Sequence, residues 1–148
     1  MDLQIEGVVD VDELQSGRSS IIYRAHHRDL GREIAVKVFR SLDQEFLTRF
    51  ETDIKDLIPL SADRRIATVY GSGLTGAGQA YLILELCESS FADVVAEDGP
   101  MAPLRACDVL IDVARAISTA HAEGVVHGNL RPDKILVDAN QELNVADF

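Results

Sequence analysis

The hydrophobic pattern of the first 86 residues predicts short strands with one helix inserted among them. Short β-branched runs at 8–11 and 21–23 are typical of strands. The segment 33–39 alternates cleanly between two faces, as a half-buried strand does. One face carries Ile34, Val36 and Val38, and the other carries Ala35, Lys37 and Phe39.

A helix is expected from about Asp43 to Leu60, because apolar residues recur there at helical spacing. These are Phe46, Phe50, Ile54 and Leu57. Two further strands, 66–70 and 81–86, are predicted on either side of a glycine-rich turn at 71–78. The first part of the chain is therefore rich in strands.

The pattern changes after residue 86. The segment Pro103–Gly124 predicts a long amphipathic helix that ends at its glycine. Its expected apolar stripe consists of Leu110, Val113, Ala114, Ile117 and His121. A loop follows, and then a hairpin of 134–137 with 142–145 around a turn at 138–141. The order of elements predicts an α+β fold in two parts, 1–86 and 87–148.

Charge and cysteine content exclude several classes of function. The 148 residues carry a formal net charge of −11, and their acidic residues are spread along the chain. Nucleic acid and anionic membranes attract clusters of Lys and Arg, so neither is expected as a partner. Cys87 and Cys107 lack the spacing of metal ligands and suit a reducing compartment. With no apolar run long enough to span a membrane and no signal-peptide pattern at the start, we expect a cytoplasmic protein.

Four segments carry a family resemblance. Residues 127–135 read His-Gly-Asn-Leu-Arg-Pro-Asp-Lys-Ile, which resembles the protein-kinase catalytic loop His-Arg-Asp-Leu-Lys-Pro-x-Asn-Ile. Residues 34–39 resemble the family's third strand, 81–86 its hinge strand, and 146–148 the start of its Asp-Phe-Gly segment. The four segments come in the family's order. The chain therefore resembles the N-terminal part of a bacterial Hanks-type Ser/Thr protein kinase domain.

This resemblance implies a kinase-like fold that is incomplete. Residues 1–86 would form an N-lobe with an antiparallel five-stranded sheet and one long helix. Residues 87–148 would form the hinge, a long helix, the catalytic-like loop and the start of a helical C-lobe. The chain stops where the activation segment would begin, so it is expected to be a fragment of a longer protein or a shortened domain that needs a partner.

The resemblance also implies a set of nucleotide-binding residues. Lys37 would contact the α- and β-phosphates, and Ala35 on the same face would leave room for adenine. The backbone of Glu85 and Cys87 would bind adenine, with Leu84 behind it. An ordinary strand lysine that points to solvent is the alternative for Lys37.

The glycine loop and the partner of Lys37 are less clearly marked. The family's three glycine positions fall on Gln15, Gly17 and Ser20, so only Gly17 could close over a phosphate, and a plain β-turn is an equal alternative. Asp53 is the expected acidic partner of Lys37, with Glu51 as the other candidate.

The catalytic positions are substituted. Asn129 stands at the position of the catalytic base, and Arg131 replaces a lysine that supports the transferred phosphoryl group. Lys134 stands at a magnesium-ligand position, where its ammonium would oppose the metal or neutralise a phosphate itself. Asp147 keeps the position of the metal-binding aspartate. Catalysis is expected to be impaired, ATP binding weak or absent, and Mg²⁺ doubtful.

Three functions remain open at this point. The first is a pseudokinase that regulates a protein partner or a fused domain. The second is an atypical active Ser/Thr kinase, of which this chain is a fragment. The third is a domain that serves only for protein interaction, in which the kinase residues are relics.

Overall fold

The computed structural model describes residues 2–138 and 140–148. The chain forms two compact units. The first takes in residues up to Lys55 together with Val69–Leu86, and the second takes in Asp56–Thr68 together with Cys87–Phe148. None of the helices in the described ranges has both the length and the apolar character that crossing a membrane requires.

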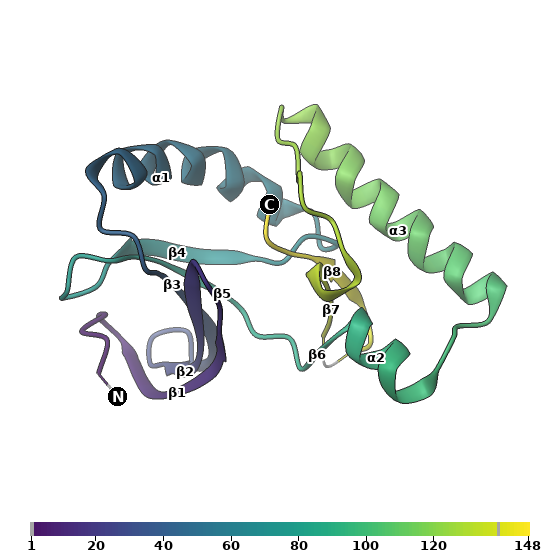
Figure 1. Ribbon diagram of the computed structural model, residues 1–148, viewed down its shortest axis with the longest axis horizontal. Coiled ribbons are helices and arrows are strands. Elements are labelled where there is room, and N and C mark those ends of the chain that lie inside the picture. The colour runs from purple at the N-terminus through teal and green to yellow at the C-terminus, as the bar shows by residue number, and fades with distance from the viewer. Residues whose placement is uncertain (1, 139) are drawn as a thin grey trace. The chain divides into compact units, whose positions relative to one another are not determined.

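The first unit is built on an antiparallel five-stranded sheet with the order β1-β2-β3-β5-β4 (Figure 1). One long helix, α1, follows β3. The predicted five-stranded sheet with one helix is therefore confirmed. The elements are β1 (Val8–Ser16), β2 (Ser20–His27), β3 (Arg32–Phe39), α1 (Gln44–Leu57), β4 (Val69–Leu74) and β5 (Ala80–Glu85).

The alternation predicted for β3 organises the core of this unit. Ile34 and Val36 have no exposed surface, and Val38 is also buried. The core cluster comprises Ile5, Val11, Tyr23, Ala25, Ile34, Val36, Val38 and Ile83. The opposite face of β3 packs differently: the Phe39 ring lies 5.5 Å from the Phe46 ring and 5.4 Å from the Phe50 ring, centroid to centroid. Aromatic contacts therefore hold the start of α1 against the end of β3.

The helix α1 ends earlier than the predicted Leu60. Its last residue is Leu57, and a 3₁₀-helix, η1 (Ile58–Ala62), follows. Proline lacks an N–H and disfavours helical geometry in the residue before it, so Pro59 explains why the α-helix stops at this point.

The predicted strand at 66–70 and turn at 71–78 are both displaced. The strand β4 starts only at Val69 and continues through two glycines to Leu74. Gly73 lies opposite Tyr81, and a Cβ at Gly73 would be 2.8 Å from the Tyr81 hydroxyl. This glycine therefore makes room for a cross-strand tyrosine and does not form a turn. The turn itself is shorter, with Gly78 N–H donating to the Thr75 carbonyl at 2.8 Å.

The second unit combines helices with a small sheet of order β6-β7-β8. The predicted hairpin is confirmed in its strands, whereas Ala139 in its predicted turn lies outside the described residues. The elements after η1 are β6 (Ser89–Ser90), α2 (Phe91–Asp98), α3 (Pro103–Ala122), η2 (Pro132–Lys134), β7 (Ile135–Val137) and β8 (Leu143–Val145).

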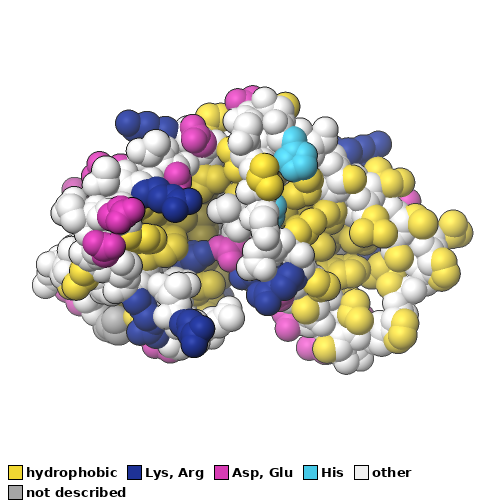
Figure 2. All heavy atoms as spheres, turned by 45° about the horizontal axis from the view of Figure 1, so that its top comes forward, with side chains coloured by type: hydrophobic (Ala, Val, Ile, Leu, Met, Phe, Trp, Pro, Cys, Tyr) yellow, Lys and Arg dark blue, Asp and Glu magenta, His cyan; other side chains and the backbone are white. Residues whose placement is uncertain are grey.

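The buried face of α3 differs from the predicted stripe. Its buried residues are Val109, Val113, Ala116 and Ala120, whereas Leu110 is 63% exposed. Ala116 and Ala120 have no exposed surface, and small side chains there let the helix approach the core closely. That core comprises Leu60, Ile66, Val109, Val113, Ala116, Ala120, Ile135 and Val145. Hydrophobic side chains are also prominent on the visible surface of the side that α3 occupies (Figure 2).

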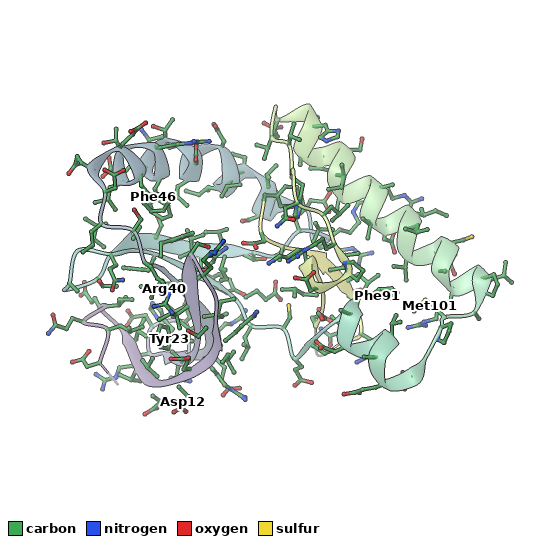
Figure 3. All side chains as sticks on the ribbon, viewed as in Figure 1. Asp12, Tyr23, Arg40, Phe46, Phe91 and Met101 are labelled. Atoms are coloured by element: carbon green, nitrogen blue, oxygen red, sulfur yellow. The ribbon has the colours of Figure 1, made fainter. Side chains whose placement is uncertain are left out.

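The helix α2 was not predicted, although the sequence contains a signal for it. Ser90 accepts a hydrogen bond from the Asp93 N–H at 3.2 Å, and the Asp93 carboxylate accepts from the Ser90 N–H at 2.8 Å. This is a capping box, and its spacing of Ser-x-x-Asp marks a helix start. Phe91 in α2 and Met101 before α3 both pack against the core of this unit (Figure 3).

Candidate functional site

Lys37 and Ala35 lie on the same face of β3, as the alternation predicts. Lys37 is opposite Ile22 of β2 and Leu82 of β5, in the middle of the sheet. Its Nζ lies 5.2 Å from the centroid of the Phe39 ring on the same face, a cation–π distance. Ala35 is also buried.

The turn between β1 and β2 is closed by its own hydrogen bonds. The Gly17 N–H donates to the Ser20 carbonyl at 2.9 Å, and Arg40 donates from Nε to the Gly17 carbonyl at 3.1 Å. Arg40 also donates from Nη2 to the Ser16 hydroxyl at 2.7 Å. The Gly17 N–H therefore already has an acceptor, and a phosphate-binding role for this turn stays a prediction.

Asp53 has a partner within its own helix. Its carboxylate lies 3.6 Å from Arg49 Nε, and these side chains are 58% and 81% exposed, respectively. Glu51 is also exposed. An ion pair between Lys37 and either acid stays a prediction. The hinge residues follow β5, which ends at Glu85; Leu84 and Glu85 pair with Ala35 and Ile34, and Cys87 is half-buried.

In the second unit, His127 ties the catalytic-like loop to the segment 146–148. Its Nε2 lies 2.8 Å from the Ala146 carbonyl, and its Nδ1 accepts a hydrogen bond from the Asn129 N–H at 3.3 Å. These two bonds assign the Nε2–H tautomer, with Nε2–H as the donor to Ala146. The ring also lies 4.8 Å from the Phe148 ring, centroid to centroid. His127 therefore has a structural role that positions Asn129 and the chain around Asp147.

Lys134 of this loop and Asp147 form a short ion pair. Lys134 Nζ lies 2.6 Å from Asp147 Oδ2, and the two side chains are only 22% and 29% exposed. The hairpin β7–β8 brings them together, because Ala146 N–H donates to the Lys134 carbonyl at 2.9 Å next to the strand ends. Asp147 has a φ of +71°, a left-handed conformation that is costly for a non-glycine residue and is common at functional sites.

Two other predicted catalytic positions lie nearer the surface. Arg131 Nη2 donates to Asp133 Oδ2 at 2.9 Å, and their side chains are 56% and 44% exposed. Asn129 is exposed. The Arg131 guanidinium is therefore engaged with a neighbouring carboxylate.

The donor set around Asp147 does not fit Mg²⁺. This ion needs oxygen ligands in near-octahedral arrangement, yet the Asp147 carboxylate is bound by the Lys134 ammonium. Within residues 2–138 and 140–148, no group of three or more His, Cys, Asp or Glu side chains is placed to hold a metal. A protonated lysine has no lone pair to offer, so Lys134 cannot serve as a metal ligand beside Asp147.

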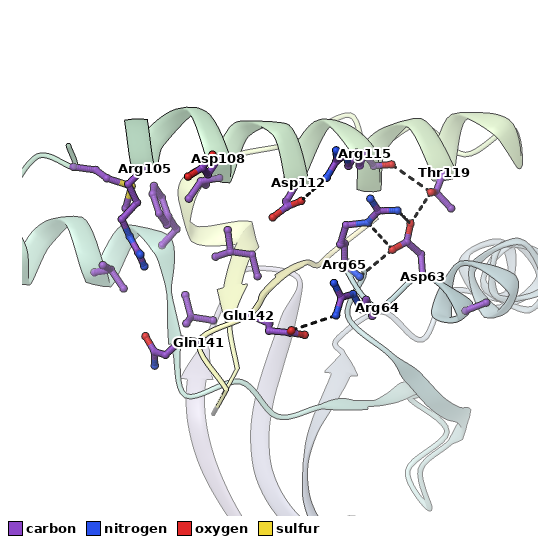
Figure 4. Close-up of a pocket in the computed structure, with 17 residues that line it drawn as sticks. Asp63, Arg64, Arg65, Arg105, Asp108, Asp112, Arg115, Thr119, Gln141 and Glu142 are labelled. Carbon is purple, nitrogen blue, oxygen red and sulfur yellow. Dashed lines mark hydrogen bonds and ion pairs between the residues drawn. The ribbon is translucent and has the colours of Figure 1, made fainter. Parts of the chain in front are cut away.

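A second charged network, not predicted from the sequence, joins the loop after η1 to α3. Asp63 accepts hydrogen bonds from Arg65 Nε at 2.9 Å, from Arg65 Nη2 at 2.8 Å and from the Thr119 hydroxyl at 2.6 Å (Figure 4). The Asp63 side chain is 9% exposed. The Arg65 guanidinium, aided by Thr119, holds the pKa of Asp63 well below its ordinary value, although burial raises it.

We expect Asp63→Asn to lower the free energy of unfolding by about 2–3 kcal/mol, because a nearly buried charge-assisted network loses its negative charge and one of its two acceptor oxygens. Urea denaturation at pH 7 measures this. Asp112→Asn is the matched control: Asp112 pairs with Arg115 at 3.4 Å in a half-exposed position and should contribute at most about 1 kcal/mol. Equal losses in the two variants would contradict this role of Asp63.

The effect of Asp63 should also depend on pH. Its pKa is lower in the folded than in the unfolded chain, so its contribution is complete above the ordinary aspartate pKa and is lost as the pH falls through the folded value. The stability difference between wild type and Asp63→Asn should therefore narrow below about pH 4.

The sequence of this chain is similar to those of known proteins. Residues 8–148 match the protein kinase domain family. Serine/threonine-protein kinase PknL of Mycobacterium tuberculosis is 33% identical over 140 residues, which cover 92% of this chain and 35% of that protein. Serine/threonine-protein kinase PknB of Mycobacterium leprae is 31% identical over 144 residues, which cover 93% of this chain and 23% of that protein. The chain thus spans about a third of PknL and about a quarter of PknB in length.

Proposed function

The chain belongs to the protein kinase domain family, and we propose that it is a regulatory member whose phosphotransfer chemistry is impaired. It would act through binding and conformation on a protein partner or on a domain fused to it. The relatives PknL and PknB are much longer than this chain, which supports a fused domain as one source of that partner.

The observation that carries this proposal is the ion pair between Lys134 and Asp147. Two unit charges about 4 Å apart interact by about 4 kcal/mol at an effective dielectric constant near 20, and these two are closer and largely shielded from solvent. A lysine therefore supplies from within the chain the positive charge that a metal ion supplies in an active kinase. The carboxylate keeps its place in the fold and is stabilised without a metal.

The base position supports the same proposal. An amide cannot accept the proton of a substrate hydroxyl near neutral pH, so Asn129 leaves the site without a general base. Loss of a positioned base typically lowers the rate by about 10²–10⁴. Arg131, which is paired with Asp133, would have to release that partner before it could support a phosphoryl group.

We expect any nucleotide binding to be weak, to need Lys37, and to be independent of Mg²⁺. Lys37 would provide charge for the phosphates, and the closed turn at Gly17 would add little. Titration of a fluorescent ATP analogue with Mg²⁺ and with EDTA, on wild type and Lys37→Ala, measures this. Affinity lost in the variant but retained in EDTA supports the proposal, whereas a loss of about tenfold or more on chelation would refute metal independence.

An atypical active kinase is the second candidate, and one observation favours it. Asp147 is retained, and the hydrogen bond from His127 to Ala146 holds the segment around it in a defined conformation. Positioning and electrostatics carry much of phosphoryl transfer, so some activity could survive without the base. Transfer of ³²P from ATP to a protein substrate that is abolished by Asp147→Ala would establish this candidate in place of the first.

A further inference from the structure

The outward face of α3 exposes large apolar side chains, although the helix buries its other face in the core of the second unit. Leu104 is 82% exposed and Ile111 is 48% exposed. The buried face consists of Val109, Val113, Ala116 and Ala120. At about 3.6 residues per turn, Leu104 and Ile111 lie on the side of the helix opposite to these four residues. The helix is therefore apolar on two sides, and only one of them is packed against the core.

The exposed residues of the outward face recur at alternating spacings of three and four. We call this row the outward seam; it consists of Leu104, Cys107, Ile111, Ala114, Ser118 and His121, all of which are exposed. The same spacing places the contact residues of a coiled coil on one side of each helix. Cys107, Ala114 and Ser118 are small, so a second helix can approach the seam closely.

The two flanks of the seam differ in chemistry, and this difference selects one orientation of a second helix. Asp108 and Arg115 lie on one flank, and Leu110 and Ile117 lie on the other. In an antiparallel pair with twofold symmetry, each flank meets the same flank of the other copy. Asp108 then lies beside Arg115 of the second copy, and Leu110 beside Ile117. A parallel pair would set the charged flank against the apolar flank.

Both charged residues are accessible for pairing between two copies. Asp108 is exposed. Arg115 lies 3.4 Å from Asp112 in a half-exposed pair, and such pairs contribute little to stability, so the arginine can exchange its partner. Asp108 and Arg115 also border the cavity shown in Figure 4, whereas none of the six seam residues lines it. The seam is therefore a separate surface of α3.

From these features we infer that the outward seam of α3 binds a second copy of this chain in an antiparallel, twofold-symmetric helix pair. Ile111 of one copy packs against Ala114 of the other, and Cys107 lies beside Ser118. The ion pair between Asp108 and Arg115 forms twice, once on each side of the symmetry axis. This inference goes beyond the proposed function and does not depend on it, because none of these residues belongs to the kinase-like site.

Sedimentation velocity of the 148-residue chain tests the inference. Between about 5 and 500 µM, the chain should show a monomer–dimer equilibrium with a dissociation constant below about 0.1 mM. Ile111→Glu should weaken the dimer at least about tenfold, because it places a carboxylate of each copy inside the seam. Leu42→Glu is the matched control: Leu42 is 61% exposed in the loop before α1, and its substitution adds the same charge. It should change the dissociation constant by less than about twofold.

The charged flank provides a test of the pairing. Asp108→Arg should weaken the dimer at least about fivefold, because it sets two arginines side by side at each of the two symmetry-related positions. Addition of Arg115→Asp restores opposite charges, so the double variant should dimerise within about twofold of wild type. A double variant as weak as the single one would contradict the pairing of Asp108 with Arg115.

Cross-linking tests the antiparallel orientation. Ser118→Cys should form a disulfide-bonded dimer with copper phenanthroline and dissolved oxygen, because Cys107 lies beside residue 118 of the second copy. Wild type should not form it through Cys107, because eleven residues along a helix separate the two Cys107 side chains by about 16 Å. A disulfide needs Cα atoms within about 7 Å. A wild-type dimer cross-linked through Cys107 would indicate a parallel pair and would overturn the inference.

Two further results would also overturn it. A chain that stays monomeric up to about 500 µM would leave this face to a different protein or to a further part of a longer chain. Equal losses in Ile111→Glu and Leu42→Glu would show that the two copies meet elsewhere. Far-UV circular dichroism shows whether each variant is folded. Leu104→Glu, at the most exposed position of the seam, should weaken the dimer in the same way and replaces Ile111→Glu if that variant does not fold.

Discussion

Replacement of Lys134 by asparagine should create a divalent-cation site at Asp147. The change removes the ammonium that lies 2.6 Å from the Asp147 carboxylate and supplies an amide oxygen in its place. Removal of a unit charge next to a doubly charged ion relieves several kcal/mol of repulsion at an effective dielectric constant of about 20. Because both side chains are partly exposed, solvent screening lowers this repulsion energy. We therefore expect Mn²⁺ affinity to rise at least about tenfold, which corresponds to about 1.4 kcal/mol.

Electron paramagnetic resonance of free Mn²⁺ measures this affinity directly on wild type and Lys134→Asn. Lys55→Asn is the matched control, because Lys55 is an exposed lysine in the last turn of α1 and its substitution changes the net charge equally. The double variant Lys134→Asn/Asp147→Asn should lose the gain. Affinity that rises equally in the control, or that survives in the double variant, would show that Asp147 is not the ligand.

The contact between Lys134 and Asp147 follows from the register of the β7–β8 hairpin. The sequence predicts a hairpin of 134–137 with 142–145 but not its register, and the observed ladder pairs Ile135 with Val145. This register brings residues 134 and 146 side by side, so Asp147 must lie near Lys134. Comparison of the sequence with the family's motifs suggests a role for Lys134 and for Asp147 separately. The ion pair between them becomes apparent only in the folded hairpin.

The buried face predicted for β3 is confirmed, whereas Val113 is the residue of the stripe predicted for α3 that the structure buries, and this difference has a physical reason. In a strand, the period of two leaves only two faces, and the face with Ile34 and Val36 is the apolar one. In α3, leucine and isoleucine compete with alanine for the buried face. Packing favoured Ala116 and Ala120, because their small size allows a close approach, and Leu110 remained exposed.

The cavity and the Asp63 network could not be predicted in this way. The Asp63 network joins two segments that are distant in sequence, the loop after η1 and α3. The cavity of about 730 Å³ beside it has further walls from α2 and the β7–β8 hairpin. The regular spacing of Arg105, Asp108, Asp112, Arg115 and Thr119 does indicate one polar helix face. Nothing in the sequence states that this face borders a cavity and not bulk solvent.

Leu60→Ala should give the largest loss of stability among single truncations in the second unit. Leu60 is 1% exposed and packs in the core formed by α3, β7 and β8, although it lies in the connection between α1 and β4. Truncation of a fully buried leucine costs about 2–5 kcal/mol, which combines lost burial with the cavity that remains. Ile58→Ala is the matched control, because Ile58 is 54% exposed and two residues away.

Urea denaturation followed by far-UV circular dichroism at 222 nm measures the loss, and amide hydrogen exchange locates it. Exchange should accelerate in α3 and in β7–β8, because these elements line the core around Leu60. Such a result would mean that residues 56–68 stabilise the unit that carries the catalytic-like loop. The connection after α1 would then be part of the core of the second unit. If Leu60→Ala were no more destabilising than Ile58→Ala, this segment would not anchor the core, and the position of Asp63 beside α3 would have to depend on its hydrogen bonds alone.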